Sequence, residues 1–436
     1  MAGHEADYPP RPYAWIVVAV LFATAVLSYT DRQVLSLLVD PIRSDLGISD
    51  MQMSLLMGTA FALVYGTAGI ALGYLADCTS RRNLILAGVV LWSLGTLACG
   101  LVHSFTGLFS ARIVVGLGEA VLSPASISLI SDYFPPARRG TAVGCYLSGI
   151  AMGVGASILI GGGVLHAIQV GALAGTPLAG LPAWRLVLLV IGAPGLLWAL
   201  VILLVREPRR HVAAADSVSA STSASAPAWH AVARVQVIPI YLVVAMASLV
   251  DNAVGGWAPS LLIRQFGRDP AGVGVQLGLL LTAGFGGGVL AGGWLADRAG
   301  ARGGWSWKLG VCLVSSLLIV SGSLLIDAPG FNTVLLAIPL YFALSGIVTA
   351  CGFSAILDAV PNRSRGLAMG VSFFLNVALG ASAGPAAVSF AGAHVFGAAA
   401  GLGPAIAATV CAGYAIAILA LLATLLLLRN LRPVTG

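Results

Sequence analysis

The feature that most constrains this chain is a series of apolar runs, each about 20 residues or longer, the length that crosses a bilayer as an α-helix. Hydrophobic residues make up 58% of the 436 residues and charged residues only 9%. A soluble protein of this size needs more charge to cover its surface. The strands of a membrane β-barrel would be about ten residues long with alternating polarity. The chain is therefore predicted to be an all-α membrane protein.

Twelve such runs can be distinguished, in two sets of six. Between the sixth and the seventh lies the segment 206–234, whose alanine and serine tract at 213–226 is typical of a flexible linker. We therefore predict an N-terminal six-helix half (1–205), a linker (206–235) and a C-terminal six-helix half (236–436). The expected spans are 13–39, 51–76, 84–103, 106–131, 140–168, 184–205, 236–263, 273–296, 307–327, 331–357, 366–393 and 403–428.

Lysines and arginines are distributed unevenly among the segments that join the spans. With the N-terminus inside, 16 of the 22 fall in cytoplasmic segments and three in outer loops, and the other three lie within spans or at the start of one. This asymmetry predicts a multi-pass protein of the inner or plasma membrane, with both termini and the linker in the cytoplasm. It also accounts for the net charge of +6, so nucleic-acid binding is not expected.

The two halves repeat each other in sequence. Gly-Tyr-Leu-Ala-Asp at 73–77 returns as Gly-Trp-Leu-Ala-Asp at 293–297, and Asp-Tyr-Phe-Pro at 132–135 returns as Asp-Ala-Val-Pro at 358–361. Both pairs fall at the same place in their sets of six spans. Two related halves around a midplane site are the architecture expected for alternating access.

The loops after the second and eighth spans resemble those of the major facilitator superfamily, which implies its fold and, by default, a monomer. In that family the loop is usually Gly-x-x-x-Asp-Arg-x-Gly-Arg-Arg; the first copy here lacks the middle arginine and the glycine. An aspartate at a helix end can pair with nearby arginines and hold one side closed, although the motif is also explained by topology and a tight turn. The predicted cytoplasmic gate is Asp77, Arg81, Arg82, Asp297 and Arg298.

Four ionisable residues lie inside the first and fourth spans, where a charge costs from roughly 3 to more than 10 kcal/mol. Asp31 and Arg32 are in the first span, Arg112 and Glu119 in the fourth. Arg112 and Glu119 are two helical turns apart and share a face. If the two spans face each other, two acids and two bases line one cavity. Protonating an acid would then free an arginine to bind a substrate carboxylate or phosphate. The alternative is a structural salt-bridge cluster.

Asp-Arg in the first span and Arg-(x6)-Glu in the fourth resemble the anion:cation symporter family, which includes sugar-acid and aromatic-acid carriers. Ser-Tyr-Thr-Asp-Arg at 28–32 and Gly-Leu-Gly-Glu-Ala at 116–120 also resemble the Spinster-type lipid carriers. The resemblance implies that Asp31 and Glu119 couple protons. It also implies that Arg32 and Arg112 bind the anion, or that Arg112 pairs with Glu119 to gate coupling.

Further polar residues in the spans are secondary candidates for substrate binding. Asp251 and Asn252 lie in the seventh span, and they mirror Asp31 and Arg32 at the offset that separates the two Gly-x-Leu-Ala-Asp copies. Asp251 could couple a proton, bind Na⁺ or contact a cationic part of the substrate. The Tyr65 hydroxyl could bond substrate or lie at the membrane interface. Also among the candidates is Asn376 in the eleventh span.

The sequence thus favours a proton-coupled symporter of a small organic anion, such as a sugar acid or aromatic carboxylate. Alternatives are a Spinster-like lysolipid or amphiphile carrier, a proton-coupled drug antiporter and a carrier-like solute sensor. An enzyme is disfavoured, because all six histidines lie in loops or at span ends. The six cysteines show no CxxC spacing, and neither a metal nor a cofactor is predicted. The expected partners are the anion, protons and membrane lipids.

Overall fold

The computed structural model describes residues 8–208, 232, 237–361, 365–397 and 401–430, and these residues form helices without any strand. The twelve expected spans all fall on helical segments. Eleven helices of the described part are long and apolar enough to cross a membrane. The remaining expected span, 51–76, is a continuous helical stretch that a π-helical turn interrupts at Leu55–Thr59. The all-α membrane fold predicted from the sequence is confirmed.

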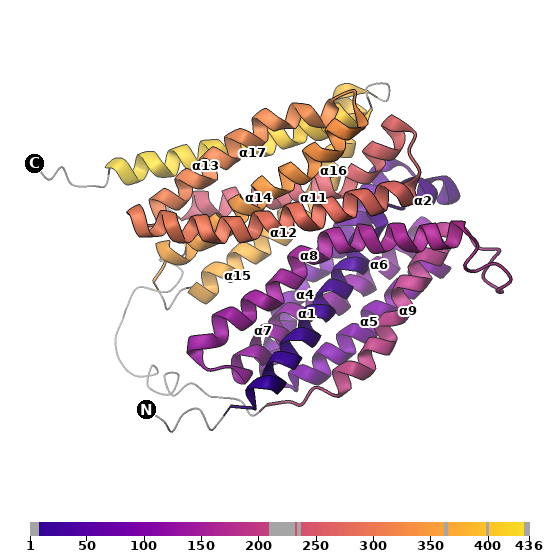
Figure 1. The fold of residues 1–436 in the computed structure, drawn as a ribbon, viewed down its shortest axis with the longest axis horizontal. Helices are drawn as coiled ribbons and strands as arrows, with labels where there is room; N and C mark the ends of the chain where they lie inside the picture. Colours follow the sequence, from indigo (N-terminus) through magenta and orange to yellow (C-terminus); the bar gives the residue numbers. More distant parts are fainter. Residues whose placement is uncertain (1–7, 209–231, 233–236, 362–364, 398–400, 431–436) are drawn as a thin grey trace, which may run out of the picture.

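Figure 1 shows two helical bundles, one built from the first part of the chain and one from the second. The first contains α1 (Arg11–Gln33), η1 (Val34–Ser36), α2 (Val39–Leu46), α3 (Asp50–Ser54), η2 (Leu55–Thr59), α4 (Ala60–Cys78), α5 (Arg81–Leu101), α6 (Phe105–Ala120), α7 (Leu122–Tyr133), α8 (Pro136–Gln169) and α9 (Ala183–Leu203). The second contains α11 (Ile238–Phe266), α12 (Pro270–Gly303), α13 (Trp305–Gly322), η3 (Ser323–Asp327), α14 (Phe331–Ala359), α15 (Arg365–Leu375), η5 (Asn376–Ala381), α16 (Ser382–Ala391), η6 (Gly392–Phe396) and α17 (Leu402–Asn430).

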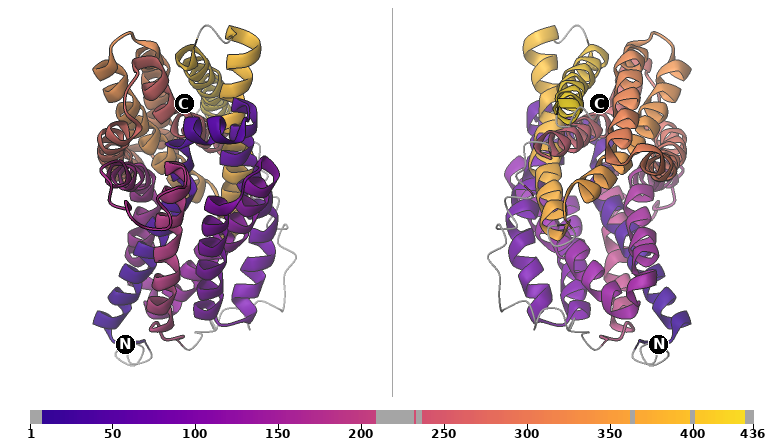
Figure 2. Two further views of the ribbon diagram at one scale, coloured as in Figure 1. Left: turned by 90° about the vertical axis from the view of Figure 1, so that its right-hand side faces the viewer. Right: turned by 90° about the vertical axis from the view of Figure 1, so that its left-hand side faces the viewer.

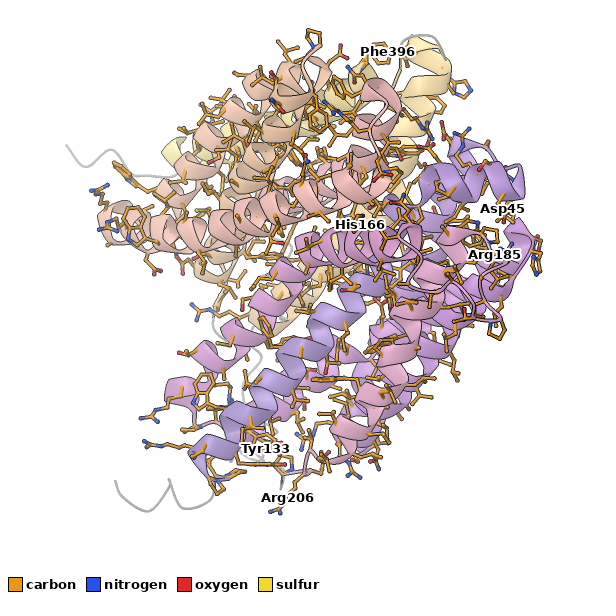
Figure 3. All side chains as sticks on the ribbon, turned by 45° about the vertical axis from the view of Figure 1, so that its right-hand side comes forward. Asp45, Tyr133, His166, Arg185, Arg206 and Phe396 are labelled. Atoms are coloured by element: carbon orange, nitrogen blue, oxygen red, sulfur yellow. The ribbon has the colours of Figure 1, made fainter. Side chains whose placement is uncertain are left out.

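The helices run between two ends of the molecule, which we call the basic end and the far end. α1 begins and α17 ends at the basic end, on the left of Figure 1, and α2 lies at the far end. Figure 3 labels a residue pair at each end: Tyr133 and Arg206 at the basic end, Asp45 and Arg185 at the far end. The side of the membrane that each end faces remains a prediction from the arginine distribution.

The internal repeat is visible in the turns at the far end. Gly47 ends α2 with φ 63° and Gly267 ends α11 with φ 59°, a left-handed conformation that glycine adopts without steric cost. Two residues after each glycine, a side chain caps the next helix: Ser49 accepts from the Gln52 N–H, and Asp269 accepts likewise at the start of α12. The two turns are separated by the same offset as the two Gly-x-Leu-Ala-Asp copies.

The halves are packed closely toward the far end. On α8, a Cβ added to Gly155 would lie 2.3 Å from the backbone nitrogen of Thr282 in α12, and one at Gly162 would lie 2.8 Å from the backbone of Gly274. Glycine thus permits backbone contact between the halves. η2 also meets the second half, where the Thr59 hydroxyl donates to the Ser382 carbonyl. Figure 2 shows this indigo segment after α1 against the golden helices of the second bundle.

The halves separate toward the basic end. On the basic-end part of α8, a Cβ at Gly140 or Gly144 would meet nothing within 4 Å, and the same holds for Gly286 and Gly287 on α12. In Figure 1 the two ribbons accordingly lie side by side on the right and diverge to the left. The structure is therefore closed at the far end and open at the basic end.

Candidate functional site

Arg32 and Glu119 form an ion pair where two helices change course. Arg32 is in the last turn of α1, before the 3₁₀ turn η1, and Glu119 is in the last turn of α6, before the helix is interrupted at Val121. The Arg32 guanidinium donates from Nη2 (2.8 Å) and Nε (3.1 Å) to Glu119 Oε2. The other oxygen, Glu119 Oε1, is buried and has no hydrogen-bond partner in the described part. The predicted meeting of the first and fourth spans is therefore present.

Three aromatic rings surround the Arg32 guanidinium. Its central carbon lies 3.9 Å from the ring centre of Phe61, 4.6 Å from that of Tyr29 and 5.1 Å from that of Tyr65. Cation–π contacts of this kind stabilise a desolvated guanidinium. Tyr65, proposed from the sequence for its hydroxyl, thus contributes its ring; Phe61 was not predicted, because an apolar residue in a span gives no signal of its own.

Arg112 is deeply buried, with 1% of its surface exposed, and no described carboxylate lies within ion-pair distance. Its guanidinium donates to three backbone carbonyls, those of Asp31 (3.3 Å), Arg32 (3.4 Å) and Leu56 (3.4 Å). Two of these belong to the end of α1, where a positive charge is favourable. The suggested pairing of Arg112 with Glu119 is not found, since Arg32 binds Glu119 instead.

Asp31 is 4% exposed, and no described base lies within ion-pair distance of its carboxylate. Its contact with Arg112 is through its backbone carbonyl. The four predicted residues therefore lie together, but their charges pair only once, between Arg32 and Glu119. Arg112 and Asp31 remain as a cation and an acid without a described counterion.

In the second half, Asp251 on α11 is surrounded by hydroxyl groups. Its Oδ1 accepts from Tyr341 (2.7 Å) and Ser345 (2.6 Å) of α14, and Tyr414 of α17 donates to Ser345 Oγ (3.0 Å). No described base pairs with it. The three hydroxyl residues were not predicted; tyrosines in the middle of apolar spans were the available signal.

The other two predicted polar residues of this half both meet Ser248. Asn252 Nδ2 donates to the Ser248 carbonyl one turn earlier in α11 (2.9 Å). The Ser248 hydroxyl donates to the backbone carbonyl of Asn376 (3.1 Å) in the π-helical turn η5. Asn252 and Asn376 are thus brought into one neighbourhood.

In the described part of the chain, Arg81 and Arg82 of the predicted gate contact residues that were not predicted for it. Arg81 pairs with Asp132 and, through Nε, with Glu207 Oε1 (2.7 Å), and the Arg82 N–H donates to Glu207 Oε2 (2.9 Å). These partners all belong to the first half or to the segment that follows it. Glu207 was not predicted. Its burial raises the pKa of the carboxyl, but the hydrogen bonds from Arg82 and Arg81 outweigh this, and the net pKa is lowered.

The described residues of the second copy of the motif make fewer polar contacts than those of the first. Asp297 is exposed and makes no ion pair with a described residue, and the Arg298 guanidinium lies 3.7 Å from the ring centre of Trp294. The Asp77 side chain lies outside the described residues. A separate pair, Lys308 Nζ to Asp358 Oδ2 (2.6 Å), ties α13 to α14. Among the described residues, the ion pairs at the basic end therefore lie within one half or join the first half to the segment that follows it.

An ionic cluster at the far end does join the halves, and sequence reasoning missed it. Arg264 at the end of α11 binds Asp40 of α2 (Nη2–Oδ1 2.6 Å) and Asp50 of α3 (Nη2–Oδ1 2.9 Å). Arg43 also binds Asp50 (Nε–Oδ1 2.9 Å). We call these four residues the far-end latch. The sequence indicated only that the arginines lay in outer loops.

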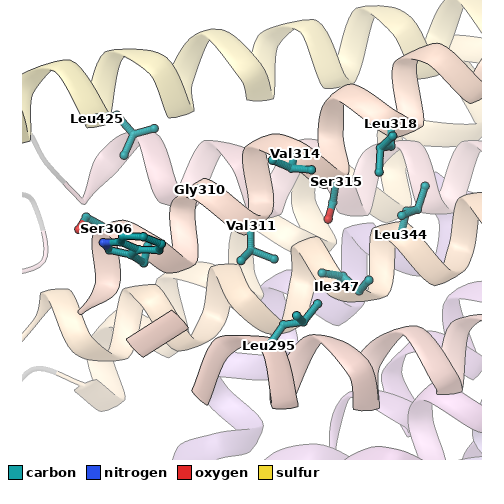
Figure 4. Close-up of a pocket in the computed structure, with 11 residues that line it drawn as sticks. Leu295, Ser306, Gly310, Val311, Val314, Ser315, Leu318, Leu344, Ile347 and Leu425 are labelled. Carbon is teal, nitrogen blue, oxygen red and sulfur yellow. The ribbon is translucent and has the colours of Figure 1, made fainter. Parts of the chain in front are cut away.

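A cavity of about 770 Å³ lies between α12, α13, α14 and α17 (Figure 4), and none of the site, gate and latch residues described above lines it. Its lining includes Leu295, Trp307, Val311 and Leu318, with Ser306 and Ser315 as the hydroxyl-bearing residues. It has no charged side chain in its lining, so it is not a candidate for binding an anion.

Two related helical bundles, joined at one end and holding unpaired charges at mid-depth, are the architecture of an alternating-access carrier. The Major Facilitator Superfamily profile matches residues 21–385, and the chain belongs to this superfamily. It is a multi-pass membrane transporter and not an enzyme.

The chain is similar to several characterised proteins along most of its length. An MFS-type efflux pump of Mycolicibacterium smegmatis is 30% identical over 387 residues, which are 88% of this chain and 85% of the relative. A hexuronate transporter of Bacillus subtilis is 27% identical, over 86% of this chain and 87% of the relative. A crystal structure of a bacterial homologue of the human lysosomal transporter Spinster, inward-facing and unoccupied, is 25% identical with a TM-score of 0.75, covering 97% of this chain and 96% of that one.

Proposed function

We propose that the protein is a proton-coupled symporter of a small organic anion, a sugar acid or another carboxylate, that works by alternating access. The observation that carries this proposal is the single Arg32–Glu119 ion pair beside a buried Arg112 that has no described carboxylate partner. One arginine is held by an acid that a proton can neutralise. The other already lacks a counterion, so together they form a site whose charge depends on protonation.

The coupling step is the transfer of a proton from water to Glu119. Its Oε1 is buried and without a described hydrogen-bond partner, so it is the oxygen that would receive the proton. The carboxylic acid formed no longer balances the Arg32 charge, and the guanidinium becomes free to bind a substrate carboxylate with two parallel hydrogen bonds. With Asp31 ionised, the four residues then have a net charge of +1, which one carboxylate neutralises.

The conformation supports this scheme. If the basic end faces the cytoplasm, as the arginine distribution predicts, the structure is open to the inside and the far-end latch closes the outside. Both termini and the linker 206–235 would then be cytoplasmic, and the halves 1–205 and 236–436 would rock around the site. The protein would act as a monomer in the inner or plasma membrane, with membrane lipids around it.

Export of an amphiphile, such as a lysolipid or a drug, is the second candidate. It is favoured by the 30% identical efflux pump and by the aromatic rings of Tyr29, Phe61 and Tyr65 around Arg32. Transport of a sugar acid is favoured by the similarity to the hexuronate transporter and by the two arginines.

The test is uptake into proteoliposomes. A panel of sugar acids, aromatic carboxylates and lysolipids would be offered with and without an inward proton gradient, to the native protein and to Asp31→Asn. We expect gradient-driven uptake of a carboxylate that is greatly reduced in Asp31→Asn, because without the Asp31 charge the site is already at +1 with Glu119 ionised and binds the anion without first taking up a proton. Glu207→Gln is the matched control, since it removes an acid outside the site. Movement of a lysolipid alone would favour the second candidate, and intact coupling in Asp31→Asn would contradict the role of the first span.

A further inference from the structure

We propose that Asp251, with Tyr341, Ser345 and Tyr414, forms a second proton-binding site in the C-terminal half, separate from Asp31 and Glu119. The link to anion transport rests on the proposed function, whereas the protonation site itself does not. The site would take up one proton from water on the open side and release it on the other.

The hydroxyl groups are arranged to bind an ionised Asp251. Tyr341 (2.7 Å) and Ser345 (2.6 Å) both donate to Oδ1, and Tyr414 donates to Ser345 (3.0 Å), so each proton in the chain points toward the carboxylate. Ser345 and Tyr414 are completely buried at 0% exposure, and Tyr341 is 5% exposed. The arrangement is therefore fixed by packing among three helices, α11, α14 and α17.

The same arrangement binds the neutral acid. No described group donates to the second oxygen, Oδ2, which can therefore hold a proton while Oδ1 continues to accept from Tyr341 and Ser345. Protonation converts the carboxylate and a hydronium ion into a carboxylic acid and water, and no hydrogen bond of the cluster has to break. A structural ion pair would lack this property, because protonation would dissolve it.

No described base stabilises the ionised form. The titratable groups that interact with Asp251 are the phenols of Tyr341 and Tyr414, and η1, η5 and α16, which also pack on α11, have no titratable side chain. α12 and α15 pack on α11 as well, and their charged residues, Asp297, Arg298, Arg302 and Arg365, make no described ion pair with Asp251. The next charged residue along α11 is Arg264, thirteen residues on and about 20 Å along the axis, and it is bound within the far-end latch. Hydroxyl groups solvate a carboxylate without cancelling its charge, so the negative charge of ionised Asp251 still interacts with any other charge nearby.

The position of Asp251 connects it to the anion site. It follows Asp31 at the offset of the internal repeat, so the two acids occupy equivalent places in the two halves. Asn252 occupies the position equivalent to Arg32, and its amide donates to the Ser248 carbonyl of the same helix. The second half thus has the acid without the base. An anion bound in the first half disfavours a further negative charge, so Asp251 is expected to load its proton together with the anion.

The site can be tested without knowing the substrate. The full-length protein in lipid would be titrated from alkaline to acidic pH by infrared spectroscopy, and the carbonyl stretching band of protonated carboxylic acids would be followed. Asp251→Asn is expected to lose one such band relative to the native protein, and Asp251→Glu is expected to keep a displaced one. The control Glu207→Gln changes an acid outside the spans. An unchanged spectrum in Asp251→Asn would overturn the proposal.

The second measurement is the number of protons taken up per anion, from parallel dye and tracer uptake in proteoliposomes. Asp251→Asn is expected to move one proton fewer per anion and to keep anion exchange at the native rate. Loss of exchange in a folded Asp251→Asn variant would contradict the proposal and assign Asp251 to substrate contact. If the native protein moves no tested anion but shows the infrared band of Asp251, the proposed function fails and the proton site stands.

Discussion

The two halves of this transporter share a fold and differ in charge. At mid-depth the first half has two acids and two bases, of which Arg32 and Glu119 are paired, and the second half has Asp251 among hydroxyl groups. At the basic end, Arg81 binds two carboxylates, those of Asp132 and Glu207, whereas Lys308 binds one described carboxylate, that of Asp358.

This difference teaches that a repeated fold keeps geometry more readily than chemistry. The turns at Gly47 and Gly267 have the same conformation because the backbone requires it. The side chains in the spans differ between the halves because each half binds a different species. A site with bases suits an anionic substrate, and a site with hydroxyl groups around one acid suits a proton.

The largest effect is expected from Arg112→Ala. This substitution removes a buried cation that has no described counterion, and it removes the donor that three backbone carbonyls share. Charge-assisted hydrogen bonds contribute about 1.5–3 kcal/mol each, so carboxylate uptake should fall about 100-fold or more. Initial rates of tracer uptake, with purified yield and melting temperature as the measure of folding, check this. Uptake close to the native rate would remove Arg112 from the site.

Substitutions at equivalent positions in the two halves should lower the substrate affinity by different amounts. Arg32→Lys keeps a charge but loses the planar fork that binds a carboxylate through two hydrogen bonds, and we expect about a tenfold loss of affinity, or about 1.4 kcal/mol. Asn252→Ala should change affinity less than about threefold, since its amide bonds its own helix. Substrate binding by calorimetry compares them, and equal losses would contradict the assignment of the anion to the first half.

The far-end latch tests whether the halves move as units. Arg264→Ala removes the ion pairs to Asp40 and Asp50, each of which contributes up to about 1 kcal/mol at a partly exposed position. The population open at the far end should rise about fivefold or more. Maleimide labelling of Ser54→Cys in a background without the native cysteines, with and without Arg264→Ala, measures this. An unchanged labelling rate would show that the latch does not hold the closed state.

The smallest effect is expected at Glu207, which distinguishes the basic ends of the two halves. Its pKa in the folded protein is lowered from the ordinary value of 4.5. Its contribution to stability is therefore fully present above pH 4.5 and is lost as the pH falls through the folded pKa. Glu207→Gln should lower the melting temperature by a few degrees at neutral pH and by less in acid. The same loss at both pH values would contradict this ion-pair role.

The fold was predictable because span length, arginine placement and the internal repeat are local or additive properties of the sequence. The lining up of Asp31, Arg32, Arg112 and Glu119 was predictable too, because helical periodicity puts them on facing stretches. Which of these four residues pair with each other could not be predicted. Arg32 binds Glu119, while Arg112 is held by backbone carbonyls at the end of α1 and in η2, and spacing along a helix does not show which backbone groups a side chain will meet.

Contacts that depend on distant helices meeting could not be read from spacing. The hydroxyl groups around Asp251 come from α14 and α17, and the far-end latch joins α2 and α3 to α11. The contact of the first gate copy with Glu207 is a similar case. The Arg81 guanidinium and the Arg82 backbone N–H both donate to Glu207, a residue that the sequence analysis assigned to the linker.

The central claim is that protonation of Glu119 releases Arg32 for the anion. The most direct measurement compares Glu119→Gln with the native protein in two assays on the same proteoliposomes, gradient-driven uptake and anion exchange without a gradient. The neutral amide imitates the protonated acid, so we expect exchange to persist and gradient-driven accumulation to fall well below the native level, to what the proton on Asp251 alone can drive. Accumulation at the native level in Glu119→Gln would contradict the claim.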